Sequence, residues 1–190
     1  MMSMTISSSS REAILTAARR AAQMHGYNGL NFRDLAKEVG IKAASIYYHF
    51  PSKADLGAAV ARRYWEDIRA ALDAMQAETP DPRLCLRRYP EMFRRSLENG
   101  NRLCLCSFMS AEYADLPDAV RHEVQTFADI NVAWLDTVLS AIDQASPHNT
   151  GRASAIFAAV SGAQLMARSR ADIALFDEII DSYCRSGLLG

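Results

Sequence analysis

The sequence has no apolar stretch near the roughly 18 residues that a membrane-spanning helix needs, because arginine and aspartate interrupt every hydrophobic segment. Its opening residues, MMSMTISSSS, contain no lysine or arginine and no apolar run, so they lack the pattern of a secretory signal peptide. We therefore expect a soluble protein in which residues 1–10 form a flexible tail.

Cysteine is scarce and histidine is scattered. The four cysteines, Cys85, Cys104, Cys106 and Cys184, show no C-x-x-C spacing, which argues against a disulfide framework and against a zinc site. A reducing cytoplasm fits this usage best. The four histidines form no H-E-x-x-H pair, and no G-x-S-x-G, phosphate-loop or dinucleotide motif occurs. The sequence thus predicts no metal site, no cofactor and no enzyme activity.

Charge is unevenly spread, although the net charge is only −1. Residues 1–63 hold nine Lys and Arg against four Asp and Glu, whereas residues 64–190 hold twelve against eighteen. All three lysines, Lys37, Lys42 and Lys53, fall in the first of these parts. A cationic cluster on a small unit of an acidic chain predicts a polyanionic partner, although a basic face can also be merely solvated.

Apolar residues recur with helical spacing along the chain, and no strand pattern appears. An all-α protein of about nine helices is therefore predicted. Capping signals and helix breakers place these helices at residues 9–25, 31–39, 42–50, 52–75, 82–98, 103–113, 117–144, 151–168 and 171–186. Ser9 and Glu12 provide the capping box of the first helix, and Pro90 should kink the fifth.

Residues 31–50 have the pattern of a helix-turn-helix motif. Ala36 lets two helices approach closely, Gly40 supplies the turn between them, and Pro51 closes the second helix after barely two turns. A helix-turn-helix binds DNA by laying its second helix in the major groove. Without further evidence, the same pattern also fits an ordinary helical corner.

The stretch NFRDLAKEVGIKAASIYYHFPSKADL resembles the signature of the TetR family of bacterial transcriptional regulators. That signature is a glycine, a short recognition helix ending in Tyr-x-x-Phe, and a Ser-Lys pair, and it is matched by Tyr47, Phe50, Ser52 and Lys53. The match is close over residues 11–60. Outside these residues only the all-helical character and the overall length agree with the family. It implies a three-helix DNA-binding domain over residues 11–56, followed by a helical effector-binding and dimerisation domain over residues 57–190.

The candidate DNA contacts are Asn31, Arg33, Lys42, Ala43, Ala44, Ser45, Tyr47, Tyr48, His49 and Lys53. Small residues at 43–45 permit close approach to the bases and contact with a thymine methyl group. Tyr47 and Lys53 resemble the phosphate contacts of the family, and Tyr48 and His49 are candidates for phosphates or base edges. Each neutralised phosphate should make binding more dependent on salt.

Asn31 and Arg33 have alternative interpretations, and Lys42 departs from the family pattern. Asn31 caps the second helix, where it either presents a phosphate site or serves as a purely structural cap. Lys42 departs from the family, which often has a serine or threonine there to cap the recognition helix. Because a cation is unfavourable at a helix N-terminus unless an anion lies near, we interpret Lys42 as a phosphate contact. Arg33 and Lys37 are equally consistent with a solvent-exposed helix face that makes no contact with DNA.

One short recognition helix reads too few base pairs for genomic specificity, so we expect a homodimer on a palindromic operator. The resemblance implies dimerisation through the last two helices. The candidate interface residues are Ala155, Ala159, Gly162, Ala163, Phe176, Ile180 and Tyr183. The same residues would also suit packing inside one chain.

The resemblance further implies a pocket among the middle helices for a small effector that releases the operator. The bulky or reactive candidates are Phe93, Cys104, Cys106, Phe108, Met109, Tyr113, Phe127, Trp134 and Met166, and such residues equally fit a plain core. Cys104 and Cys106 lie near a predicted helix start beside Arg102, where the helix dipole and the positive charge lower a thiol pKa. Sensing of electrophiles or oxidants is therefore a hypothesis, and two small buried side chains are its alternative.

The sequence as a whole predicts a ligand-responsive, DNA-binding transcriptional regulator, with repression as the family default. The alternative is an all-helical protein-interaction module that does not bind DNA. The lysine cluster and the register of Tyr47, Phe50 and Lys53 argue against that alternative.

Overall fold

The computed structural model describes the backbone of residues 2–144 and 148–190, with side chains from Ser10 onward. These residues form ten α-helices and two 3-10 turns and contain no strand, so the predicted all-α fold is confirmed. The elements are α1 (Met2–His25), η1 (Tyr27–Gly29), α2 (Phe32–Val39), α3 (Ala43–His49), α4 (Lys53–Glu78), α5 (Pro82–Arg88), α6 (Glu91–Glu98), α7 (Leu105–Ala111), η2 (Tyr113–Asp115), α8 (Asp118–Ile142), α9 (Asn149–Arg170) and α10 (Ile173–Arg185).

Two sequence-based helix assignments need correction. The helix predicted over residues 82–98 is two helices, α5 and α6, because Pro90 interrupts the segment as the N-cap of α6 instead of kinking a continuous helix. The first helix begins at Met2, before the capping box predicted at Ser9 and Glu12. Its end at His25 agrees with the prediction, and Gly26 follows with a φ of 68°.

The described residues pack as two compact units. Of the described residues, the first comprises 2–64 and Leu105–Gln125, and the second comprises Trp65–Cys104, 126–144 and 148–190. The long helices α4 and α8 each contribute residues to both units.

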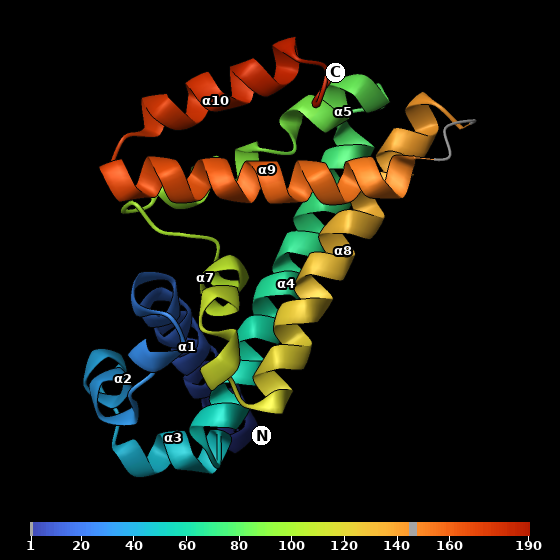
Figure 1. The fold of residues 1–190 in the computed structure, drawn as a ribbon. Coiled ribbons are helices and arrows are strands. Elements are labelled where there is room, and N and C mark those ends of the chain that lie inside the picture. Colours follow the sequence, from blue (N-terminus) through green and yellow to red (C-terminus); the bar gives the residue numbers. More distant parts are fainter. Residues whose placement is uncertain (1, 145–147) are drawn as a thin grey trace. The chain divides into compact units, whose positions relative to one another are not determined.

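In the first unit α1 packs against α2, α3 and α7, which lie around it in Figure 1. The apolar faces of these helices and of the first turns of α4 supply the core of the unit, where Ile14, Leu35, Ile46 and Leu56 are fully buried. This small core holds α3 in a fixed orientation, although a seven-residue helix would not be stable alone.

The turn between α2 and α3 follows from its glycine. Gly40 has a φ of 74° and a ψ of 31°, the left-handed conformation that ends many helices and that glycine adopts without strain. The N–H of Ile41 donates to the carbonyl of Ala36 at 3.0 Å, which satisfies one of the last carbonyls of α2. At the other end of α3, Phe50 has an extended backbone, as expected for the residue before Pro51.

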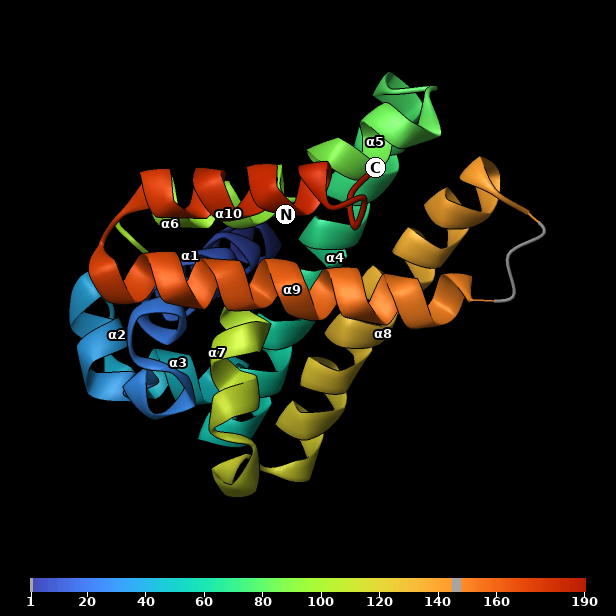
Figure 2. The same ribbon diagram turned by 45° about the horizontal axis from the view of Figure 1, so that its top comes forward.

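In the second unit α9 and α10 run antiparallel to each other, with α6 packed against both (Figures 1 and 2). The buried side chain of Gln164 ties this layer together. Its Nε2 donates to the carbonyl of Phe93 at 2.8 Å, and its Oε1 accepts from the N–H of Cys104 at 3.0 Å. Among the described residues, no helix is long and apolar enough to cross a membrane.

Candidate nucleic-acid interface and effector groove

The N-terminus of α2 is capped as the sequence predicts. The Oδ1 of Asn31 accepts from the N–H groups of Arg33 at 2.9 Å and Asp34 at 3.4 Å. The side chain of Asn31 is therefore committed to capping, which fits the structural alternative directly. Its exposure leaves a phosphate contact through the same helix end open.

Tyr47 lies beside this helix end. Its ring packs on Phe32, the first residue of α2, with 4.7 Å between the centroids, and 57% of Tyr47 remains exposed. Tyr48 is 81% exposed, and its ring meets that of His49 edge-on at 5.1 Å. An exposed aromatic side chain held by a neighbour presents a hydroxyl group to a partner at little entropic cost.

The start of α3 is accessible to solvent and has no side-chain cap. Lys42 is the N-cap residue, is exposed, and makes no side-chain hydrogen bond to the helix. Ala44 is exposed, and Ala43 and Ser45 are half-buried, so small side chains line the first turn. This part of α3 can approach another surface closely.

Lys53 begins α4 and is held from one side. Its Nζ lies 4.5 Å from the centroid of the ring of Tyr27, a residue to which no motif in the sequence points. The start of α4 itself is capped by Ser52, whose Oγ accepts from the N–H of Asp55 at 3.1 Å and donates to its carboxylate at 2.7 Å.

The remaining basic groups near α2 are partly neutralised. The Nζ of Lys37 lies 3.9 Å from the Asp34 carboxylate, and Arg20 bonds to Glu38. Within the described residues, neither Lys42 nor Lys53 takes part in an ion pair. The positive charge that stays available for an anion thus lies at the starts of α2, α3 and α4, since Arg33 in the first turn of α2 is exposed and forms no ion pair with the described residues.

The second unit contains a groove of about 470 Å³ between α4 and α8. Its lining consists of Arg69, Leu72, Asp73, Gln76, Thr126, Asp129, Ile130, Ala133, Trp134 and Thr137. The residues from α4 recur every three or four positions, so they share one face of that helix. Of the pocket residues predicted from the sequence, only Trp134 belongs to this groove, because those residues were chosen for bulk or reactivity, whereas six of the ten lining residues are polar.

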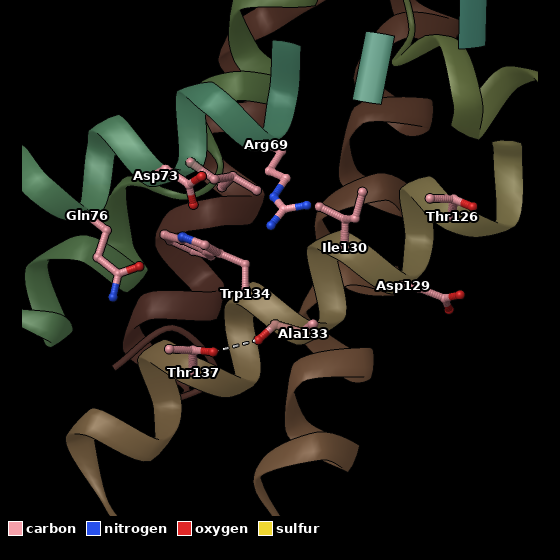
Figure 3. A pocket seen from close by; sticks show the side chains of 10 residues that line it. Arg69, Asp73, Gln76, Thr126, Asp129, Ile130, Ala133, Trp134 and Thr137 are labelled. Carbon is pink, nitrogen blue, oxygen red and sulfur yellow. Dashed lines mark hydrogen bonds between the residues drawn. The ribbon is translucent and has the colours of Figure 1, made fainter. Parts of the chain in front are cut away.

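Trp134 forms part of the groove wall. Figure 3 shows its indole reaching from α8 toward the side chains of Asp73 and Gln76 on α4. The indole is stacked on the buried ring of Tyr89 at 5.8 Å, and its Nε1 is buried without a hydrogen-bond partner among the described residues. Since an unpaired buried N–H is costly, a hydrogen-bond acceptor that reached this nitrogen would be stabilised.

Tyr89 anchors this wall. Its hydroxyl donates to Oδ1 of Asn131 at 2.9 Å, and the amide of Asn131 donates to the carbonyl of Phe127 at 2.8 Å. Burial raises the pKa of the Tyr89 hydroxyl well above its usual value, and the nearby Cys104 acts in the same direction. The hydroxyl therefore remains a neutral donor.

The other predicted pocket residues do not line the groove. Phe93, Cys104, Cys106, Met109 and Phe127 are buried in the cores of their units, and Phe108 is half-buried. Tyr113 and Met166 are exposed by 44% and 48%. Among the described residues, no group of three or more His, Cys, Asp or Glu side chains could hold a metal ion.

The predicted interface residues divide between surface and core. Ala155 and Gly162 are exposed on α9, together with Met166 and Leu165, of which Leu165 is 58% exposed. Ala163 and Phe176 are buried within the chain, and Ala159, Ile180 and Tyr183 are half-buried. The exposed positions of α9 recur every three or four residues and so form one apolar stripe of small and flexible side chains.

The helix-turn-helix region matches a known sequence family. The family model described as "Bacterial regulatory proteins, tetR family" matches residues 14–60. The HTH-type transcriptional regulator LmrA of Bacillus subtilis is 43% identical over 75 residues, which cover 38% of this chain and 39% of LmrA. The aligned stretch thus spans about two fifths of that curated relative.

The whole fold matches solved structures. A transcriptional regulator of the TetR family from Agrobacterium tumefaciens has a TM-score of 0.87 and 30% sequence identity, with 96% of this chain and 97% of that chain covered. A TetR transcriptional regulator from Legionella pneumophila has a TM-score of 0.87 and 27% identity, with 92% and 95% covered. The similarity therefore extends over nearly the full length of both chains.

Proposed function

The chain belongs to the TetR family of bacterial regulatory proteins, and from this premise we propose that it is a homodimeric transcriptional repressor released from its operator by a small effector. The observation that carries the proposal is a set of three exposed or partly exposed groups: Lys42 at the start of α3, Tyr47 on the same helix, and Lys53 at the start of α4.

DNA binding is the first part of the proposal. The first turn of α3 enters the major groove, where Ala43, Ala44 and Ser45 lie close to base edges. Tyr47, Lys42 and Lys53 contact phosphates and fix the register of the helix. The cations at the starts of α3 and α4, which have no ion-pair partner among the described residues, support this assignment, because a committed cation would give up an existing partner to bind DNA.

Dimerisation is the second part. The seven residues of α3 can read only a few base pairs, so specificity requires two copies on two half-sites. The exposed apolar stripe of α9 supports a four-helix interface made by α9 and α10 of both copies.

Effector binding is the third part. The groove between α4 and α8 is of a size that holds a small molecule, and Trp134 contributes to its wall an aromatic side chain whose N–H has no partner among the described residues. Effector and DNA are then coupled, so each weakens the binding of the other by the same factor. Sensing through Cys104 or Cys106 is a second candidate mechanism, but both residues are buried, and a reagent would reach them only after local opening.

A binding assay with DNA from upstream of the gene tests the proposal. Fluorescence anisotropy at several salt concentrations should give tight binding whose logarithm falls linearly with the logarithm of salt, by roughly 0.9 for each phosphate neutralised. Lys53→Ala should weaken binding and make this dependence shallower. The protein-interaction alternative predicts no such binding, or weak binding that does not depend on Lys53.

The groove is tested separately. Thr137 lines the groove, so Thr137→Trp places a bulky side chain there. The variant should bind DNA with unchanged affinity, but the effector should release it from DNA less readily. Loss of DNA binding in this variant without loss of fold would contradict the assignment of the groove to the effector.

A further inference from the structure

The contact between Lys53 and Tyr27 links the proposed phosphate contact to the interior of the first unit. The ammonium nitrogen lies 4.5 Å from the centroid of the Tyr27 ring. Tyr27 is 7% exposed, so its ring is a fixed part of the core, whereas Lys53 is half-buried and reaches the surface. The ammonium group of a flexible lysine side chain thus lies against the face of a buried aromatic ring.

Tyr27 is fixed on two sides. Its ring lies so close to α4 that a Cβ added at Gly57 would come within 2.7 Å of the ring carbon Cε2. Its backbone N–H donates to Oε2 of Glu112 at 2.6 Å, and the amide of Asn28 donates to Oε1 of the same carboxylate at 3.3 Å. Glu112 follows α7 directly, so a residue 85 positions away holds Tyr27 in place.

The approach of Glu112 needs a glycine. A Cβ at Gly26 would lie 2.2 Å from Oε2 of the carboxylate, and Gly26 also has a φ of 68°. Both facts restrict this position to glycine. The close carboxylate contact is therefore built into the backbone of the turn before η1.

An aromatic face suits a phosphate-binding lysine better than a carboxylate would. A carboxylate neutralises the ammonium, and its bond must be broken when DNA arrives. The ring attracts the ammonium through its quadrupole, leaves its charge intact, and leaves donors free to bond to a phosphate. A long, flexible lysine side chain then loses less conformational freedom on binding.

We propose that Tyr27 is a positioning residue that holds Lys53 ready for a DNA phosphate, and that Glu112 fixes Tyr27 in that role. The inference rests on the proposed function, because it requires Lys53 to contact DNA. It adds that the segment containing Glu112 sets the affinity for DNA through Tyr27.

Matched variants test the ring. Tyr27→Phe keeps the aromatic face and should bind DNA as the wild type does, whereas Tyr27→Leu removes the face and should bind about two to five times more weakly. In the Lys53→Ala background, Tyr27→Leu should cause no further loss, because the two residues act through one contact. Equal binding by the Phe and Leu variants, or additive losses, would overturn the inference.

The same series separates the inference from the proposed function. If Lys53→Ala leaves DNA binding unchanged, the assignment of Lys53 as a phosphate contact is wrong. If Lys53→Ala weakens binding but Tyr27→Leu does not, the phosphate contact stands and the positioning role fails.

A third pair of variants tests Glu112. Glu112→Gln retains an oxygen that accepts from the Tyr27 N–H, and it should keep most of the affinity for DNA. Glu112→Ala should weaken binding by a factor similar to that of Tyr27→Leu. Wild-type affinity in Glu112→Ala would show that Tyr27 needs no such support.

A spectroscopic measurement on the wild type covers the case in which Tyr27→Leu fails to fold. The chain has only three lysines, so the side-chain resonances of lysine-labelled protein can be assigned by replacing each with arginine. The ε-methylene protons of Lys53 should be shifted upfield by the Tyr27 ring, and those of Lys42 should not. An unshifted Lys53 signal would refute the contact in solution.

Discussion

The ring of Tyr47 packs on the ring of Phe32, with 4.7 Å between the centroids and planes inclined by 60°. Phe32 is the first residue of α2, so this contact places the exposed Tyr47 of α3 at the N-terminus of α2. The partial positive charge of that helix end and the tyrosine hydroxyl can then bind the same phosphate.

Tyr47→Phe removes the hydroxyl group and keeps the ring on Phe32. A hydrogen bond to a charged group contributes about 1.5–3 kcal/mol, so affinity for DNA should fall by about tenfold or more. Because no charge is lost, the salt dependence in an anisotropy titration should keep its slope. The thermal midpoint should stay at its wild-type value, and unchanged affinity would exclude this phosphate contact.

Lys42→Ser should change stability and DNA binding in opposite directions. The serine can accept from the first N–H groups of α3, which Lys42 leaves without a side-chain cap, and a new N-cap stabilises by about 1 kcal/mol. The lost cation should weaken DNA binding and reduce the salt slope by about 0.9. Denaturant unfolding and salt titrations measure the two effects, and a variant that is more stable but binds equally well would make Lys42 a surface residue only.

Gly162→Arg should separate folding from dimerisation. A Cβ at Gly162 meets nothing within 4 Å in one chain, so the substitution is tolerated in the α9 helix itself. If the stripe of α9 is the interface, the buried charges of two arginines should make the protein monomeric in sedimentation velocity. Circular dichroism should remain helical. Ala77→Arg, at an exposed position of α4, is the matched control and should stay dimeric.

Alkylation should distinguish the four cysteines. Cys184 is half-buried, whereas Cys85, Cys104 and Cys106 are buried. Burial raises the pKa of the Cys85 thiol, although Arg88 opposes the shift. Mass spectrometry after a short treatment with iodoacetamide should therefore find Cys184 modified first. Modification of Cys104 or Cys106 at the same rate would favour the sensor hypothesis instead.

Tyr89 should make stability fall at alkaline pH. Its pKa is raised in the folded protein, so the unfolded chain loses the proton first as the pH passes about 10. This contribution is fully present below that pH and is lost as the pH rises toward the folded pKa. Urea unfolding between pH 8 and 11 should show a shallower decline for Tyr89→Phe than for the wild type. The variant should also be less stable at pH 8 by about 1–3 kcal/mol, since Asn131 loses its donor.

The helix-turn-helix of this protein could be predicted from the sequence, because local chemistry determines where its helices begin and end. Asn31, Gly40 and Pro51 act on their immediate neighbours, so the bounds of α2 and α3 agreed with prediction to within one residue. Lys42 could likewise be recognised as an uncapped start, because capping depends on residues within one turn. The break at Pro90 was foreseen as a kink, since sequence alone does not say whether tertiary packing bridges a proline.

Only the tertiary structure decided what Lys53 contacts and where a ligand could bind. Glu112 reaches Tyr27 across 85 positions, and no periodicity in the sequence reports such a contact. The groove between α4 and α8 arises where two faces leave space, so Arg69, Asp73 and Asp129 line it although they look like ordinary solvated positions. Bulky residues such as Phe93 and Met109 lie in the core, because burying apolar surface is favourable. A bulky apolar residue in the sequence is equally compatible with a core and with a pocket wall, so the sequence does not distinguish the two.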